Sequence, residues 1–333
     1  MLYSHLGRSG LLVSRLCVGT LGFGPEVPQP EAHAILDRCH EHGINFVDTS
    51  NVYGKKHGGD WAEEVIGRWF SQGNKRRERT VIATKVYEPQ SDWPNDSKLS
   101  ALHIRRACDA SLKRLQTDYI DIYQMHHIDR DTPWEEIWEA MEVLRLQGKI
   151  LYVGSSNFAG WHLARAQEAA NDRQFFGLVS EQSLYNLMTR DIEREVLPAA
   201  REYGIGLLAW SPLNRGMLGG ILAREREGSL PENFNGTSVT GPTRGSSAML
   251  DEYRDRLERY ESLSAELGAT PAQLALAWLT SQPGVASAII GPANVDQLDE
   301  AARSAELKLS DEALQRLDEI FPGYRTAPED YAW

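Results

Sequence analysis

The chain has 333 residues, of which 41% are hydrophobic and 25% are charged, and its formal net charge is −12. This length can bury one large core, so it allows either an α/β barrel with insertions or two modest domains. The acidic balance argues against a nucleic-acid or anionic-membrane partner, because such partners need a basic surface that releases counterions.

Strand-like and helix-like segments alternate along the chain. A turn-containing stretch near residues 3–13 indicates a hairpin, and runs of β-branched and aromatic residues indicate eight strands at 15–20, 46–48, 81–85, 120–126, 150–155, 178–182, 206–210 and 286–290. Helical spacing occupies the intervals at 31–42, 61–70, 100–115, 134–147, 159–171, 192–203, 271–281 and 295–303. Eight strand–helix pairs predict an α/β protein, a (β/α)8 TIM barrel formed by residues 1–333 as a single domain.

Three segments lie outside this eightfold alternation. Residues 211–250, rich in Gly, Ser, Pro and Asn, predict a long loop after the seventh strand, and helical spacing predicts extra helices at 251–267 and, near the C-terminus, at 310–320. A loop of this length in a compact domain is usually a functional lid or a disordered segment. Since it leaves a strand at the end where barrels carry their chemistry, we favour the lid.

Four ionisable residues follow three of the predicted strands. They are Asp48 and Tyr53 after the second strand, Lys85 at the end of the third and His126 at the end of the fourth. Barrel enzymes carry their chemistry at the carboxyl ends of the strands. We therefore expect these four side chains to meet in one proton-transfer site.

These residue types suit the reduction of a carbonyl group. A phenol has an ordinary pKa of about 10, which a neighbouring ammonium lowers, so Lys85 would make Tyr53 a better acid. Asp48 would keep Lys85 protonated. Neutral His126 would orient a substrate carbonyl while Tyr53 protonates the alkoxide that forms.

Each of these residues alone is a weak indicator, because single Tyr, Lys and His residues more often pack or face solvent. Their joint position at successive strand ends favours a site. His127 competes with His126, but strand side chains alternate between faces, and His126 shares its parity with Gln124 and Ile122. The other histidines mostly lie on helices or loops without i, i+4 pairing, so we predict no metal site.

The remaining strand ends carry amides, hydroxyls, an indole and a glycine, namely Ser156, Asn157, Gln182, Trp210, Ser211 and Gly291. Amides can hold a carboxamide, an indole can stack on a planar heterocycle, and glycine before a helix lets backbone N–H groups approach a phosphate. This pattern indicates a nicotinamide dinucleotide bound across the barrel mouth. No GxGxxG spacing occurs at a strand-to-helix turn, so a Rossmann domain is not predicted.

Several motifs resemble those of the aldo-keto reductase superfamily from end to end, among them GINFVDTSNVYG, VIATK, SLKRLQTDYIDIYQMH, GKILYVGSSNF, SEQSLYN, LLAWSPL and AIIGPANVDQLDE. Within it, the chain is most similar to bacterial reductases related to potassium-channel β-subunits. The resemblance implies an (α/β)8 barrel that transfers hydride between NAD(P)H and a carbonyl. It also implies that Tyr53 is the general acid, that Lys85 and Asp48 lower its pKa, and that His126 orients the carbonyl.

The same resemblance implies a set of cofactor-binding residues. Asp48 is one of them; Ser156, Asn157 and Gln182 hold the carboxamide of the nicotinamide, and Trp210 stacks on its ring. Ser211, Pro212, Leu213, Gly216 and Leu218 line the pyrophosphate near Thr20 and Leu21, and Gly291, Gln297 and Glu300 face the adenosine. Ala293 stands where the family often has a residue that binds the adenosine 2′-phosphate. Arg244 or Arg215 could supply that cation. NADP(H) is favoured by family habit, and NAD(H) stays open as an alternative.

Two other functions were weighed against a general NAD(P)H-dependent aldehyde or ketone reductase. One is a slow-turnover regulatory subunit that senses its cofactor, against which the complete set of four catalytic residues argues. The other is a reductase of nucleotide-linked keto deoxysugars in a natural-product pathway.

We further expect a small-molecule carbonyl substrate and a cytoplasmic protein, since Cys17, Cys39 and Cys108 lack metal-ligand spacing and no apolar run is long enough for a spanning helix. A homo-oligomer is compatible with the sequence.

Overall fold

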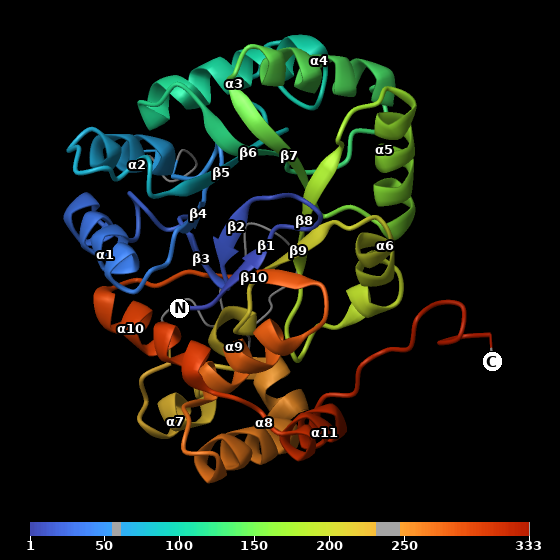
Figure 1. The fold of residues 1–333 in the computed structure, drawn as a ribbon. Helices are drawn as coiled ribbons and strands as arrows, with labels where there is room; N and C mark the ends of the chain where they lie inside the picture. The colour runs from blue at the N-terminus through green and yellow to red at the C-terminus, as the bar shows by residue number, and fades with distance from the viewer. Residues whose placement is uncertain (55–60, 231–246, 333) are drawn as a thin grey trace.

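A closed ring of eight parallel strands forms the centre of the molecule (Figure 1). The computed structural model describes residues 1–54, 61–230 and 247–332. In ring order the strands are β3 (Leu16–Gly19), β4 (Phe46–Asp48), β5 (Val81–Val86), β6 (Ile120–Met125), β7 (Ile150–Ser156), β8 (Leu178–Leu184), β9 (Gly206–Trp210) and β10 (Val285–Ile290). β10 pairs with β3 and closes the ring, so the predicted (β/α)8 barrel is confirmed.

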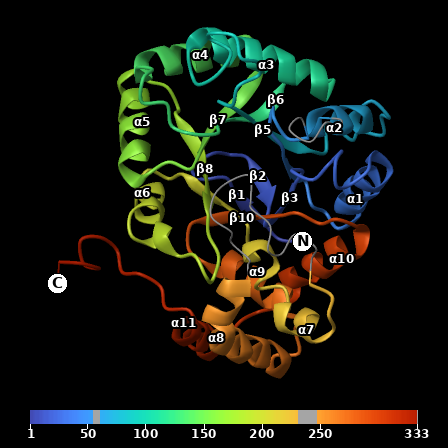
Figure 2. The same cartoon turned by 180° about the vertical axis from the view of Figure 1, so that it is seen from behind.

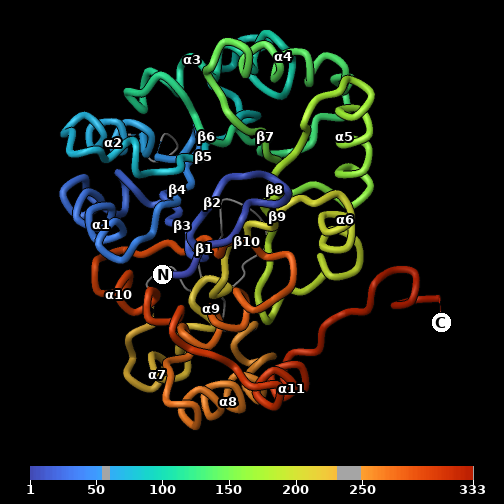
Figure 3. The backbone as a smooth tube through the Cα atoms, viewed as in Figure 1, coloured from blue at the N-terminus to red at the C-terminus, as the bar shows by residue number. Residues whose placement is uncertain are grey.

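Helices surround the barrel, as the views from either side and the chain trace show (Figures 2 and 3). Those of the eightfold alternation are α1 (Gln29–Glu41), α2 (Ala62–Phe70), α3 (Ala101–Leu115), α4 (Trp134–Leu146), α5 (Gly160–Asp172), α6 (Val196–Glu202), α9 (Pro271–Ser281) and α10 (Val295–Arg303). Three more helices, α7 (Ile221–Arg226), α8 (Ser247–Glu266) and α11 (Asp311–Ile320), lie together at one side of the ring (Figure 1). No helix in the described ranges is long and apolar enough to cross a membrane.

The barrel strands are apolar on both faces, and this accounts for two separate cores. Alternate residues such as Phe46, Ile122 and Leu208 fill the barrel interior. Their neighbours, such as Val47 and Tyr123, pack outward against the helices. Strands buried on both faces are usual in parallel sheets covered by helices. This alternation determines which strand-end side chains point towards the barrel axis.

A hairpin closes the amino-terminal end of the barrel. Strands β1 (Tyr3–His5) and β2 (Leu12–Ser14) pair antiparallel, and Leu6 belongs to the interior core. Gly7 has φ +55°, and a Cβ atom there would lie 2.4 Å from the carbonyl oxygen of Gly204. Only glycine fits this left-handed, close-packed position without strain. The opposite end of the barrel, where the strands finish, stays available for a site.

The structure differs from the sequence prediction in three local features. The predicted loop at residues 211–250 contains helix α7, and its residues 231–246, including Arg244, lie outside the described part of the chain. The predicted helix at 192–203 is a 3-10 turn at Asp191–Glu193 followed by α6. β6 ends at Met125 rather than at residue 126, so His126 lies just past the strand.

Candidate active site

Asp48, Tyr53 and Lys85 come together at the carboxyl end of the barrel, as predicted. Lys85 Nζ donates hydrogen bonds to Asp48 Oδ2 at 2.6 Å, to the backbone oxygen of Thr49 at 2.9 Å and to Tyr53 Oη at 3.1 Å. An ammonium group has three protons, so these acceptors satisfy it completely. The side chains of Lys85 and Asp48 are 0% and 3% exposed, which makes this a fully desolvated ion pair.

Opposing effects act on the protonation of Lys85. Burial disfavours its charged form, but the Asp48 carboxylate and Tyr53 outweigh burial and raise the pKa of Lys85. The amine is therefore an ammonium at neutral pH. This agrees with the predicted role of Asp48 in keeping the lysine protonated.

Burial also governs the phenol. It raises the pKa of Tyr53 above the ordinary value, and the Lys85 ammonium opposes this rise. Lys85 thus acts in the predicted direction, but the net shift is upward rather than downward. Tyr53 holds its proton at neutral pH as a result.

Two amides from other strands complete the surroundings of Asp48. Gln124 Nε2 on β6 and Gln182 Nε2 on β8 donate to Asp48 Oδ1 at 3.0 Å and 2.8 Å. β4 and β8 are four places apart in the ring of eight, so the bond from Gln182 spans the barrel interior. The contact of Gln124 with Asp48 was not predicted from the sequence. The inward-facing position of Gln124 next to a buried acid was the available indication.

His126 lies beside Tyr53 just beyond β6. Their ring centroids are 6.1 Å apart in an edge-to-face arrangement, and His126 Nδ1 is 3.5 Å from Ser50 Oγ. Gln124 and Ile122 point into the barrel as predicted, but β6 ends at Met125, so the alternation of strand side chains does not separate His126 from His127. The His127 ring stacks on that of His126, with centroids 4.9 Å apart, and its Nε2 is 3.5 Å from Glu88 Oε1.

The predicted carboxamide-binding residues form one connected rim. Asn157 accepts a hydrogen bond from Trp210 Nε1 at 3.3 Å, and its Nδ2 donates to Ser156 Oγ at 3.0 Å. Ser156 Oγ in turn donates to the backbone oxygen of Gln182 at 2.9 Å. Asn157 has φ +59°, so its left-handed backbone turns the chain at the end of β7. Amides, a hydroxyl and a half-buried indole are therefore gathered at one edge of the barrel mouth.

Glu181 supports this rim from behind and was not predicted. It is fully buried, and its Oε1 accepts from the Phe158 backbone N–H at 3.0 Å and from Ser183 Oγ at 2.8 Å, while Ser155 Oγ donates to its Oε2. Burial raises the pKa of Glu181 to about 7. Strand alternation was the available indication, because Gln182 points inward and its neighbour must point towards the helices.

The other predicted cofactor residues differ in exposure. Thr20 is buried and donates a hydrogen bond to the backbone oxygen of Asp48, whereas Leu21 is 63% exposed. In the turn after β9, Ser211 and Gly216 have φ +55° and +89°. Pro212 in this turn is buried and Leu213 is half-buried. The side chain of Leu218 is 0% exposed in the core, so its backbone alone can face a ligand. At the last strand, a Cβ on Gly291 would meet no atom within 4 Å, Gln297 accepts from the Ala293 N–H at 2.9 Å, and Glu300 is half-exposed.

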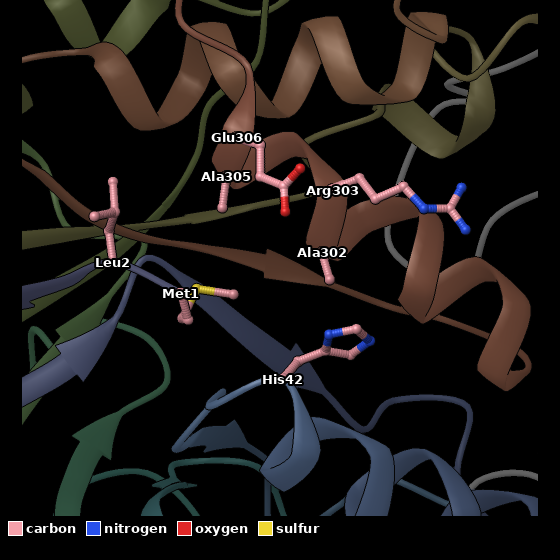
Figure 4. A pocket seen from close by; sticks show the side chains of 7 residues that line it. All are labelled: Met1, Leu2, His42, Ala302, Arg303, Ala305 and Glu306. Carbon is pink, nitrogen blue, oxygen red and sulfur yellow. The ribbon is translucent and has the colours of Figure 1, made fainter.

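A separate cavity of about 210 Å³ lies where α1 and α10 end (Figure 4). It is lined by Met1, Leu2, His42, Ala302, Arg303, Ala305 and Glu306. None of the predicted site residues borders it.

Known proteins match this chain along most or all of its length. The family described as "Aldo/keto reductase family" matches residues 15–321. An uncharacterized oxidoreductase, YrpG, of Bacillus subtilis is 48% identical over 100% of both chains. A probable voltage-gated potassium channel subunit beta of Arabidopsis thaliana is 34% identical over 99% of this chain and 100% of its own, and versiconal hemiacetal acetate reductase of Aspergillus parasiticus is 34% identical over 98% and 100%. The chain therefore belongs to the aldo/keto reductase family.

Proposed function

We propose that this protein reduces an aldehyde or ketone to an alcohol with NAD(P)H, and that Tyr53 is the general acid. Membership of the family supports carbonyl reduction with a nicotinamide cofactor. The observation that carries the assignment is the contact of the buried Lys85 ammonium with Tyr53 Oη at 3.1 Å. When bound, the reduced nicotinamide supplies the hydride.

The hydrogen-bond inventory determines which way the Tyr53 proton can go. An ammonium only donates, so Tyr53 Oη accepts from Lys85 and its own O–H is available to another acceptor. A substrate oxygen near this hydroxyl would receive the proton as it gains negative charge. Lys85 stabilises the phenolate that remains, at a site where burial strengthens every electrostatic interaction.

His126 supports the orientation of the substrate oxygen. It is half-buried beside Tyr53, and the Ser50 hydroxyl lies 3.5 Å from its Nδ1. A contact on one ring nitrogen helps to fix the ring, and the proposed role has an imidazole nitrogen face the carbonyl oxygen. A group placed in this way reduces the freedom of the bound substrate and so contributes to the rate.

The rim residues fit a nicotinamide group. Ser156, Asn157 and Gln182 offer hydroxyl and amide groups that match a carboxamide, and the Trp210 indole offers a flat apolar face. The turn at Ser211–Leu218 and the open space at Gly291 would accept the phosphates and the adenosine end. These assignments follow the family resemblance.

The replacement Tyr53→Phe tests the proposal. It removes the transferable proton and keeps the ring, so we expect kcat to fall by about a hundredfold or more while the cofactor Kd changes less than about twofold. Tyr3→Phe is the matched control, since Tyr3 lies at the far end of the barrel and donates to the Gly43 backbone oxygen. Near-parent turnover of Tyr53→Phe would refute the role of general acid.

We further propose NADPH as the preferred cofactor, with Arg244 as the ligand of the 2′-phosphate. Family resemblance supports this choice, and Ala293 offers no cation. Arg244→Ala should raise the KM for NADPH about tenfold or more, the loss expected for a charge-assisted pair, and leave the KM for NADH unchanged. Arg224→Ala, at an exposed position on α7, is the control. An equal response to both cofactors, or a parent that prefers NADH, would refute this assignment.

A cofactor-sensing regulatory subunit is the second candidate, favoured by the similarity to potassium channel β-subunits. For such a subunit we expect a burst in which one cofactor is oxidised per protein, followed by slow turnover. For a reductase we expect continuous turnover with a suitable carbonyl. A panel of aldehydes, ketones and keto sugars, followed at the cofactor absorbance, distinguishes the two and also tests the deoxysugar alternative.

The three buried, unpaired cysteines support the proposal that the enzyme works in the reducing cytoplasm.

A further inference from the structure

One group of three potential metal ligands converges among the residues that the structure describes. It consists of Glu88, His126 and His127, whose ligand atoms all lie within 4.8 Å of one another. All three side chains are half-buried. Two imidazoles and a carboxylate are the protein ligands of many zinc sites that keep a fourth position open.

Strand pairing explains why these residues meet. β5 and β6 are neighbours in the barrel, and Val86 on β5 is aligned with Met125 on β6. Glu88 lies two residues beyond Val86 and His127 lies two residues beyond Met125, so both residues follow the ends of neighbouring strands. Histidines at i, i+4 within one helix do not reveal this cluster, because its ligands follow the ends of two strands, and the sequence therefore predicted no metal site.

One pair of the three ligand atoms is close to the spacing that a zinc ion requires, and the third lies within 4.8 Å of both. With Zn–N and Zn–O bonds of about 2.0 to 2.1 Å, two ligands of a tetrahedral ion lie roughly 3.3 Å apart. His127 Nε2 and Glu88 Oε1 are already 3.5 Å apart. The rings of His126 and His127 are parallel, with centroids 4.9 Å apart, so at least one ring must turn before a nitrogen of each can point at the same ion. Partial exposure leaves room for that rotation and for a water ligand.

We propose that Glu88, His126 and His127 form a Zn²⁺ site at the barrel mouth, and that bound Zn²⁺ inhibits the enzyme. The inhibition rests on the proposed function, because His126 is there the group that orients the substrate carbonyl. An imidazole nitrogen that binds zinc is no longer available to a carbonyl oxygen. The ion also fills space next to Tyr53, whose ring faces His126. The inhibition should therefore be competitive with the carbonyl substrate.

Calorimetric titration of the full-length protein with ZnCl₂ tests the site independently of activity. We expect one equivalent to bind, and His127→Gln and Glu88→Gln each to weaken binding by about tenfold or more. His126→Gln should weaken it similarly. His5→Gln is the matched control, because His5 is exposed on β1 at the opposite end of the barrel, and it should leave the affinity unchanged. Absence of binding by the parent, or parent-like affinity in both His127→Gln and Glu88→Gln, would overturn the site.

Steady-state kinetics with and without ZnCl₂ tests the inhibition. In the parent, zinc should raise the KM for the carbonyl substrate without raising that for the cofactor. His127→Gln and Glu88→Gln should keep kcat within about twofold of the parent in the absence of zinc and need about tenfold more zinc for half-inhibition. Zinc that binds without inhibiting would retain the site and overturn the inhibition. An active His126→Gln with weakened zinc binding would instead refute the proposed role of His126 in reduction and leave the site intact.

Discussion

Lys85 and Asp48 form a buried ion pair. Removing its charges one at a time and then together separates what the pair contributes to stability from what it contributes to the proposed reaction. Lys85→Met keeps a similar volume but leaves the Asp48 carboxylate, 3% exposed, with only the amides of Gln124 and Gln182 as partners. Breaking a buried pair at one end costs about 3 to 5 kcal/mol, because the other charge stays desolvated. We therefore expect Lys85→Met to lower the free energy of unfolding by that amount.

Asp48→Asn should have a similar cost for the opposite reason. The asparagine amide can still accept from Gln124 or Gln182, but the Lys85 ammonium loses its carboxylate. Burial then dominates and lowers the pKa of Lys85, so the amine tends to lose its proton in the folded state.

The double variant Lys85→Met/Asp48→Asn removes both charges and is the decisive measurement. Since neither charge is left unpaired, its loss of stability should be smaller than the sum of the two single losses, with a coupling energy of about 2 kcal/mol or more. Activity should not recover. Without Lys85, burial raises the pKa of Tyr53 unopposed by the ammonium, and kcat should stay at least about a hundredfold below the parent.

Urea unfolding of the four proteins at pH 7, with kcat measured on the same preparations, gives both quantities. Additive losses of stability would show that the two residues do not act as a buried ion pair. A double variant that regains near-parent kcat would show that Tyr53 does not need the Lys85 ammonium to act as an acid, and the proposed role of Lys85 would be wrong.

Two further predictions concern the supports of the barrel. Glu181 has a folded pKa of about 7, above its ordinary value of 4.5, so the folded state binds the proton more tightly and stability falls as pH rises from about 4.5 to about 7. Glu181→Gln should remove a contribution of about 3 kcal/mol to this pH dependence, read as the difference in urea stability between variant and parent; a constant difference across that range would contradict it. Gly7→Ala should lower stability by about 2 kcal/mol or more, because its Cβ would meet backbone atoms at 2.4 to 2.8 Å and its φ is +55°. Gly10→Ala, where nothing lies within 4 Å, should change stability by less than about 0.5 kcal/mol in the same assay, and equal effects would refute the packing argument.

The eight strands and most helices could be predicted because their information is local. Five of the six residues of Val81–Val86 are β-branched or apolar, Lys85 being the exception, and such a run indicates a strand buried on both faces. Helix α7 was not predicted because it is short and because contacts from helix α8 stabilise it. Arg254 on α8 pairs with Glu225 at 2.8 Å, and Glu261 accepts the Leu222 N–H at 3.0 Å, contacts that no local spacing reveals.

The candidate site shows the same division. Asp48, Lys85 and Tyr53 could be placed together because each follows a predicted strand end. The depth of their burial could not be predicted, and it is burial that turns the net shift of the Tyr53 pKa upward. The contacts from Gln124 and Gln182 to Asp48 depend on strands far apart in sequence, so they required the closed ring.

The hydrogen bond from Gln182 to Asp48 makes the candidate active site depend on strands from both halves of the barrel. Its two ends belong to strands on opposite sides of the barrel, so neither half of the chain can assemble the acid's full set of partners alone. During refolding, the recovery of turnover should therefore coincide with the last strand pairing rather than with the first appearance of helical or sheet structure. If the proposed site is the catalytic one, turnover reports on the completed ring of strands, and we expect a partly assembled barrel to be inactive even with every proposed catalytic residue present.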